Sequence, residues 1–192
     1  MVRPPRIVLA ALLAVVAAVA LAGCSGGGWQ EKCDSSADGI ITCAPGDRPG
    51  PVKVSGELLD GGTYDLSADL GQVVVVNFWG SWCAPCVAEA DDLEGTYQAT
   101  KASGVRFLGV NVQDQRDKAR AFEQGRVSYP SLFDPASRQA LAFEIPPNST
   151  PATVVLDRQG RIAVVIRKAV RRDDLEPIVA RVAAERPADG AR

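Results

Sequence analysis

A pair of cysteines separated by two residues lies between a run of β-branched residues and a helical pattern, and this placement most restricts the fold. Cys83 and Cys86 flank Ala84-Pro85, and four consecutive valines stand just upstream. The stretch 72–78 is typical of a central strand buried on both faces. Downstream, apolar residues recur at helical spacing as far as Gly104. The expected inward face of this helix is Val87, Ala90, Leu93, Tyr97 and Ala102.

The spacing of the two cysteines predicts redox chemistry. Two residues between them, within the first turn of a helix, bring the sulfurs close enough to bond. The first sulfur then lies beside unpaired backbone N–H groups, which favours the thiolate form of Cys83. We therefore expect Cys83 to attack a disulfide and Cys86 to resolve the product. A buried structural pair or half of a metal site is the alternative interpretation.

Composition removes several classes of function. The chain has 192 residues, 46% of them hydrophobic and 23% charged, which suits one globular domain. It contains no histidine, so Ser-His-Asp catalysis, imidazole metal sites and His-ligated haem are excluded. The net charge is −2 and no basic stretch dominates, so no nucleic acid partner is expected. We predict neither a metal nor a cofactor beyond a redox-active disulfide.

The first residues have the pattern of an export signal. Arg3 and Arg6 precede an apolar run over 7–22 that is short for a membrane-spanning helix, which needs ~20 such residues. The ending Leu21-Ala22-Gly23-Cys24 resembles the lipobox of bacterial lipoproteins, in which the cysteine is acylated. We expect a signal peptide over 1–23 and a lipid anchor at Cys24. The domain would then lie on the extracytoplasmic face of the bacterial cell membrane, although an ordinary cleaved signal is the alternative.

Two further cysteines lie in the segment 24–50, which we interpret as a lipid-anchored linker. Cys33 and Cys43 bracket a polar stretch rich in turn residues, which can bring its ends together. Outside the cytoplasm disulfides persist, so we predict a structural Cys33–Cys43 disulfide. A second redox pair or a metal site are the alternatives.

The rest of the chain alternates strands and helices. We expect a hairpin around Asp60-Gly61-Gly62 and a buried strand over 105–112. A helix over 114–124 with Ala119 and Phe122 inward and a short helix over 137–143 follow. A closing hairpin over 152–166 and a last helix over 172–185 complete the fold, and 188–192 form a disordered tail. This order predicts an α/β fold with a mixed central sheet and helices on both faces.

Several segments resemble the TlpA-like family of membrane-anchored, thioredoxin-fold thiol-disulfide oxidoreductases. They are 76–86, which holds the dithiol, together with 107–112, 129–134 and 150–157. The resemblance implies a thioredoxin-like domain over 51–187, with an N-terminal β-hairpin and a helical insert before the cis-proline strand. It also implies reduction of disulfides in exported proteins, often apocytochrome c during cytochrome c maturation, with electrons from a membrane dithiol donor.

The resemblance also assigns roles to single residues. Glu89 stands three residues after Cys86, where the family places an acid that handles the proton of the resolving thiol. A solvated helix residue is the alternative for Glu89. Thr150 and Pro151 match the family's cis-proline position, which presents backbone to an extended substrate. A trans proline at the start of a strand is the alternative there.

Two tryptophans flank the dithiol. Trp82 is expected at an apolar rim for the substrate chain, and Trp79 in the core.

Two other functions remain open from the sequence. An oxidase would install disulfides in exported proteins, and its thiolate would be more strongly stabilised. A non-catalytic lipoprotein would bind a partner and keep Cys83 and Cys86 in a closed bridge. A peroxidase is disfavoured because Trp-Cys-Ala-Pro-Cys is not the peroxiredoxin Thr-x-x-Cys pattern, and a copper chaperone of this fold would want histidine.

Overall fold

The computed structural model describes residues 28–146 and 149–185. The expected signal peptide, the anchor Cys24 and the tail after 187 lie outside these residues. Within them, no helix combines the length and the apolar character needed to cross a membrane.

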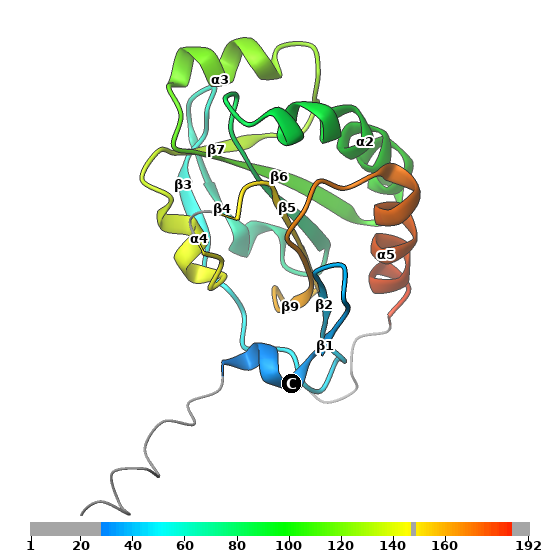
Figure 1. The fold of residues 1–192 in the computed structure, drawn as a ribbon. Helices are drawn as coiled ribbons and strands as arrows, with labels where there is room; N and C mark the ends of the chain where they lie inside the picture. The colour runs from blue at the N-terminus through cyan, green and yellow to red at the C-terminus, as the bar shows by residue number, and fades with distance from the viewer. Residues whose placement is uncertain (1–27, 147–148, 186–192) are drawn as a thin grey trace, which may run out of the picture.

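A mixed sheet forms the centre of the molecule (Figure 1). It has seven strands in the order β1-β2-β9-β8-β5-β6-β7. Strand β5 runs parallel to β6 and antiparallel to β8, and β6 runs parallel to β7. The strands are β1 (Asp34–Ser35), β2 (Ile40–Thr42), β5 (Val73–Trp79), β6 (Val105–Val112), β7 (Ser131–Asp134), β8 (Ala152–Leu156) and β9 (Ile162–Ile166). Every residue of β5 is buried, as the valine run predicts for a strand covered on both faces.

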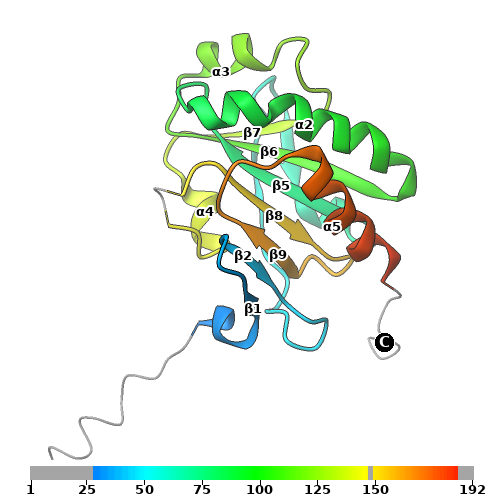
Figure 2. The ribbon, with the colours of Figure 1, turned by 45° about the vertical axis from the view of Figure 1, so that its right-hand side comes forward.

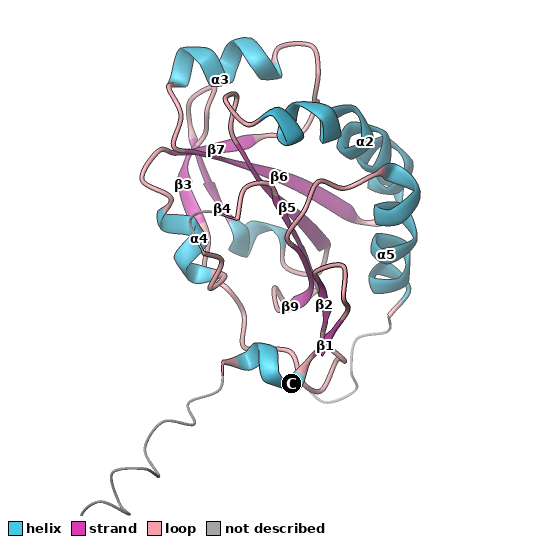
Figure 3. Ribbon diagram, in the orientation of Figure 1, coloured by secondary structure: helices cyan, strands magenta, loops and turns pink. Residues whose placement is uncertain are grey.

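Helices cover both faces of the sheet, as Figures 2 and 3 show. Helices α2 (Ala84–Thr100) and α5 (Arg172–Ala184) pack on one face, and α3 (Arg116–Glu123) lies at the end of that face. The other face carries α4 (Arg138–Ala142) and the hairpin of β3 (Ser55–Glu57) and β4 (Thr63–Asp65). The described residues also form three short 3-10 helices: η1 (Trp29–Lys32), η2 (Leu66–Asp69) and η3 (Lys101–Ser103). The predicted α/β fold is thereby confirmed.

The inward face of α2 differs from the prediction. Val87 is 41% exposed and Ala102 is exposed as well. Ala90 and Leu93 are buried as predicted, but the helix also turns Cys86, Glu89, Thr96 and Thr100 toward the interior. The apolar pattern was misleading because the polar residues Thr96, Thr100 and Glu89 occupy buried positions. The apolar Val87, in contrast, is exposed to solvent.

Two segments join the sheet that the sequence did not assign to it. Residues 131–134 add β7 in parallel beside β6. Residues 34–42, expected in the linker, form β1 and β2, and β2 pairs with the outer edge of β9. An edge strand left bare would expose unpaired N–H and C=O groups, so this pairing completes the sheet.

A disulfide joins Cys33 to Cys43 at that edge. In the chain-entropy model, a bridge closing a loop of this size stabilises the fold by about 2–3 kcal/mol. The double variant Cys33→Ala/Cys43→Ala is therefore expected to lose about that much free energy of unfolding, measured by urea denaturation. An unchanged denaturation midpoint would show that the bridge does not act as a structural brace.

Candidate active site

The dithiol lies where β5 ends and α2 begins. Cys83 is the N-cap of α2, and its Sγ accepts a hydrogen bond from the backbone N–H of Cys86 at 3.3 Å. The two residues form a disulfide and are only 4% and 2% exposed. Pro85 lies in the first turn, where its missing N–H would have no helical partner. The helix thus directs unpaired amide groups at the sulfur of Cys83.

The loop before Cys83 is held by Asp114, a residue that the sequence did not single out. One carboxylate oxygen of Asp114 accepts the N–H of Ser81 at 2.6 Å, and the other accepts the Ser81 hydroxyl at 2.9 Å. Asn111 and the N–H of Gln115 bind the same carboxylate. Burial opposes ionisation, but these hydrogen bonds outweigh it and lower the pKa of Asp114. Asp114 follows the C-terminal end of β6, which lies beside β5, the strand that leads to the dithiol. This position is the sequence signal that could have identified Asp114.

Trp82 lies at the surface beside the dithiol. Its side chain is 54% exposed, and its indole N–H donates to the carbonyl of Val112 at 3.2 Å. A side chain at Gly80 would lie 2.4 Å from the indole nitrogen, so glycine is needed there. Trp82 and the exposed Val87 together form an apolar rim at this end of α2.

Glu89 is buried on the inward face of α2 and is 1% exposed. One oxygen accepts from the Asn77 side chain at 2.9 Å and the other from the N–H of Val170 at 2.8 Å. Burial raises the pKa of Glu89 to about 7, against the opposing effect of these two hydrogen bonds. Near neutral pH this carboxyl group can therefore both take up and release a proton.

The Thr150–Pro151 peptide bond is cis. Strand β8 begins directly after it, and the register pairs Ala152 with Phe78 of β5. Pro151 therefore lies just beyond the end of β5 from which the chain runs to Cys83. Adjacent strands bring the cis-proline segment and the dithiol to the same edge of the sheet.

The sequence-predicted residues fall into two places. Cys83, Cys86, Glu89, Trp82, Thr150 and Pro151 gather at the C-terminal end of β5, whereas Cys33 and Cys43 lie at the edge formed by β1 and β2. Two strands, β8 and β9, separate that edge from β5. Across residues 28–146 and 149–185, no group of three Cys, Asp or Glu side chains is arranged to hold a metal ion.

Comparison with known proteins relates the chain to thiol-disulfide chemistry. The AhpC/TSA family matches residues 51–165. The thiol-disulfide oxidoreductase ResA of Geobacillus kaustophilus (strain HTA426) is 30% identical over 119 residues, which cover 62% of this chain and 67% of that protein. The thiol:disulfide interchange protein HelX of Rhodobacter capsulatus is 30% identical over 168 residues, covering 83% of this chain and 91% of HelX.

A solved structure of a related protein has the same fold as this chain. The crystal structure of a secreted thiol-disulfide isomerase from Corynebacterium glutamicum superposes with a TM-score of 0.74 at 34% sequence identity. The superposition covers 80% of this chain and 98% of the other. The thioredoxin-like fold expected from the sequence is confirmed.

Proposed function

This chain belongs to the AhpC/TSA family and is a thiol-disulfide oxidoreductase of the thioredoxin-like fold, and from that premise we propose that it reduces disulfides of exported proteins outside the cytoplasm. The observation that carries the proposal is the Cys83–Cys86 disulfide at the N-terminus of α2, with the buried carboxyl group of Glu89 on the same helix face.

The proposed reaction starts from the reduced dithiol. The thiolate of Cys83 attacks one sulfur of the substrate disulfide, forms a mixed disulfide and expels the other substrate sulfur as a thiolate. Cys86 then gives its proton to the carboxylate of Glu89, and its thiolate attacks the sulfur of Cys83. The Cys83–Cys86 disulfide forms and the second substrate thiolate leaves, so the substrate gains two electrons and the enzyme loses them.

The charges around the dithiol support the reducing direction. A dithiol is strongly oxidising when its reduced form is stabilised. Positive groups near the sulfur provide this stabilisation because they favour the thiolate. In the described part of the chain, the acids Glu89 and Asp114 face this region without an ion pair to Lys or Arg. The whole sequence has no histidine. A buried carboxylate beside Cys86 disfavours a second negative charge, which disfavours the reduced, thiolate form.

The rim of the site supports a polypeptide substrate. Trp82 and Val87 expose apolar surface next to the dithiol, and the segment at Thr150 and Pro151 lies at the same sheet edge. We propose that an extended chain binds there by backbone pairing with Thr150 and by contact with Trp82. An exported protein with a cysteine pair, such as apocytochrome c, fits this site, and a membrane dithiol protein is the proposed electron donor.

The location follows from the sequence resemblance to a lipobox. We propose that residues 1–23 are removed and that Cys24 carries the lipid that holds the domain at the extracytoplasmic face of the membrane. Mass spectrometry of the membrane fraction should then find an acylated Cys24 as the first residue, and an unmodified N-terminus in the soluble fraction would contradict the proposal.

The reduction potential tests the direction of electron flow. Equilibration with glutathione is expected to give a value near that of thioredoxin, about −270 mV, with insulin reduced by the dithiol form. A value near −120 mV, as for a strong oxidant, would indicate an enzyme that installs disulfides instead. A Cys83–Cys86 bridge resistant to dithiothreitol would indicate a partner-binding protein without catalysis.

A further inference from the structure

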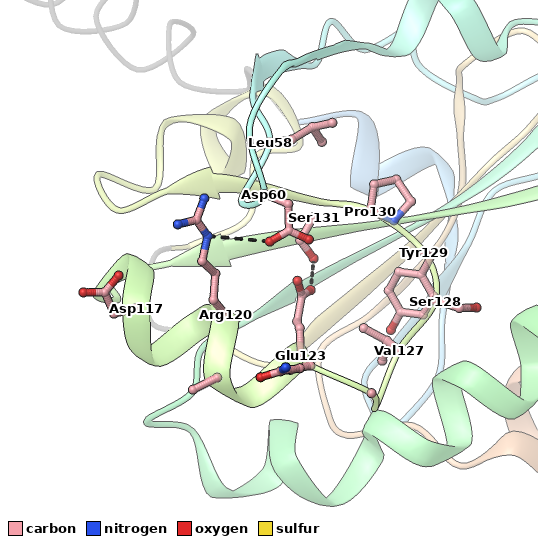
Figure 4. Close-up of a pocket in the computed structure, with 13 residues that line it drawn as sticks. Leu58, Asp60, Asp117, Arg120, Glu123, Val127, Ser128, Tyr129, Pro130 and Ser131 are labelled. Atoms are coloured by element: carbon pink, nitrogen blue, oxygen red, sulfur yellow. Dashed lines mark hydrogen bonds and ion pairs between the residues drawn. The ribbon is translucent and has the colours of Figure 1, made fainter.

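A large open cavity lies between α3, the β3–β4 turn and the segment that leads into β7 (Figure 4). Its volume is about 800 Å³. Asp60, Asp117, Arg120, Glu123, Tyr129 and Ser131 are among the residues that line it. Figure 4 shows Glu123 directed from the end of α3 toward Ser131. The cavity therefore brings solvent to a half-buried carboxyl group that the proposed reaction does not use.

A chain of hydrogen bonds connects Glu123 to Trp79, the last residue of the strand that precedes the dithiol. The indole N–H of Trp79 donates to the hydroxyl oxygen of Ser131 at 3.2 Å, and the Ser131 hydroxyl donates to Glu123. In the described part of the chain, the other oxygen of Glu123 has no hydrogen-bond partner. That oxygen is free to accept a proton.

The residue opposite this chain of hydrogen bonds is a glycine that leaves room for it. A side chain at Gly109 on β6 would lie 1.9 Å from the Ser131 hydroxyl and 2.8 Å from the indole nitrogen of Trp79. Gly109 therefore has to lack a side chain for Ser131 to stand between Trp79 and Glu123.

A second, narrow cavity joins Glu123 to the resolving cysteine. Cys86 and Glu123 both line it, together with Asn77, Trp79 and Tyr129. It offers about 10 Å³, close to the space that one water molecule needs. Glu89 is not among its lining residues and is closed from solvent. Glu123 is thus the acid that meets both the space beside Cys86 and the open cavity.

We propose that Glu123 is a second proton acceptor for Cys86 and connects the buried thiol with solvent. The inference rests on the proposed function and adds a proton exit to it. When Cys86 resolves a mixed disulfide, its proton passes through the narrow cavity to the carboxylate of Glu123. The Cys86 thiolate bonds to Cys83, the substrate thiolate leaves, and Glu123 releases the proton into the open cavity.

The surroundings of Glu123 suit this role. Burial, together with the negative charge of Asp60, raises its pKa to about 7 against the opposing effect of the hydrogen bond from Ser131. Arg120 pairs with Asp60 at 3.6 Å. The other groups facing this space are Asp117 on α3 and Tyr129 before β7. Near neutral pH, Glu123 can therefore exchange a proton in both directions.

The test separates the two steps of the dithiol with 5,5′-dithiobis(2-nitrobenzoate), which releases one coloured thiolate per attack. The fast phase reports Cys83, and the second phase reports resolution by Cys86. Glu123→Gln is expected to slow the second phase about tenfold at pH 7 and to leave the first phase unchanged. The inflection near pH 7 in the pH profile of the second phase should weaken as well.

Asp117→Asn is the matched control, since it removes a negative charge from the same helix and the same open cavity without lining the space beside Cys86. It should behave as the wild type. If the Glu123→Gln profile of the second phase superimposes on that of the wild type, the inference is wrong, whereas a missing first phase in the wild type would contradict the proposed function.

A measurement on the unaltered protein covers the case in which Glu123→Gln does not fold. The titration of Glu123, followed by carbon-13 NMR of its carboxyl group, should shift by about one pH unit between the oxidised and the reduced protein, because interacting sites titrate together. Identical titration curves in the two redox states would overturn the inference.

Discussion

Replacing Cys83 by serine is expected to abolish disulfide reduction, with a loss of at least about a thousandfold in the rate of insulin reduction. A serine hydroxyl stays protonated where a cysteine at the helix N-terminus forms a thiolate. Among the described cysteines none can replace it, because Cys86 lies inside α2 rather than at its N-cap, and Cys33 and Cys43 are joined in a separate bridge. The fold should persist, since Ser is a favourable N-cap for α2.

Cys86→Ser is the matched control for this experiment. It keeps the attacking sulfur of Cys83 but removes the resolving one, so the variant should accumulate a mixed disulfide with its substrate that mass spectrometry detects. Equal insulin reduction by Cys83→Ser and the wild type would contradict the assignment of the nucleophile. Mixed disulfides found on Cys86 rather than Cys83 would reverse the two roles.

Replacing Glu89 by glutamine is expected to slow resolution of the mixed disulfide about a hundredfold at pH 7. The amide keeps a shape similar to the carboxyl group and can still accept the hydrogen bond from Val170, but it cannot take the proton of Cys86. The two-phase thiol assay measures the effect, because only the second phase should change. An unaltered second phase would assign Glu89 a structural role.

The raised pKa of Glu89 also predicts how the stability of the protein depends on pH. Its pKa in the folded protein is about 7, above the ordinary value of 4.5. Below pH 4.5 the carboxyl group of Glu89 is protonated in both the folded and the unfolded protein, and its contribution to the free energy of unfolding is fully present. As the pH rises toward 7 the unfolded chain releases the proton first, so the folded state loses stability, by about 3 kcal/mol in total for a shift of this size.

The variant Glu89→Gln should remove this part of the loss between pH 4.5 and pH 7 in urea unfolding. Glu94→Gln on the same helix is the control. The hydrogen bonds of Glu94 outweigh its burial and lower its pKa, so that variant should not flatten the profile in this range. A Glu89→Gln profile parallel to the wild type would contradict the link between burial and protonation.

The local features of the site could be predicted from the sequence. The strand before the dithiol, the helix after it, and the pairing of Cys83 with Cys86 depend on residues within about one turn or one strand of each other. The β-branched run, the proline in the first turn and the Cys-x-x-Cys spacing act through the backbone next to them. Local chemistry of this kind needs no knowledge of the rest of the chain.

Other features were decided only by contacts between distant parts of the chain. The apolar Val87 is exposed while the charged Glu89 is buried, because α2 packs with the polar face that meets Asn77 and Val170. The buried Arg48 likewise joins Asp157 and Glu185, residues more than one hundred positions away. A periodic pattern records which residues are apolar but not which partner covers them.

The second acid of the site shows this limit most clearly. In the sequence, Glu123 has the pattern of an ordinary polar residue at the end of an amphipathic helix. Its partners Ser131 and Trp79 come from two other strands, and Gly109 from a third makes room for them. The sequence by itself determined the dithiol, the buried strand before it and the helix after it, because these depend on neighbours along the chain. The tertiary structure alone decided that Glu123 meets the space beside Cys86 and that Glu89 is closed from solvent, because burial depends on segments that meet only in the folded molecule.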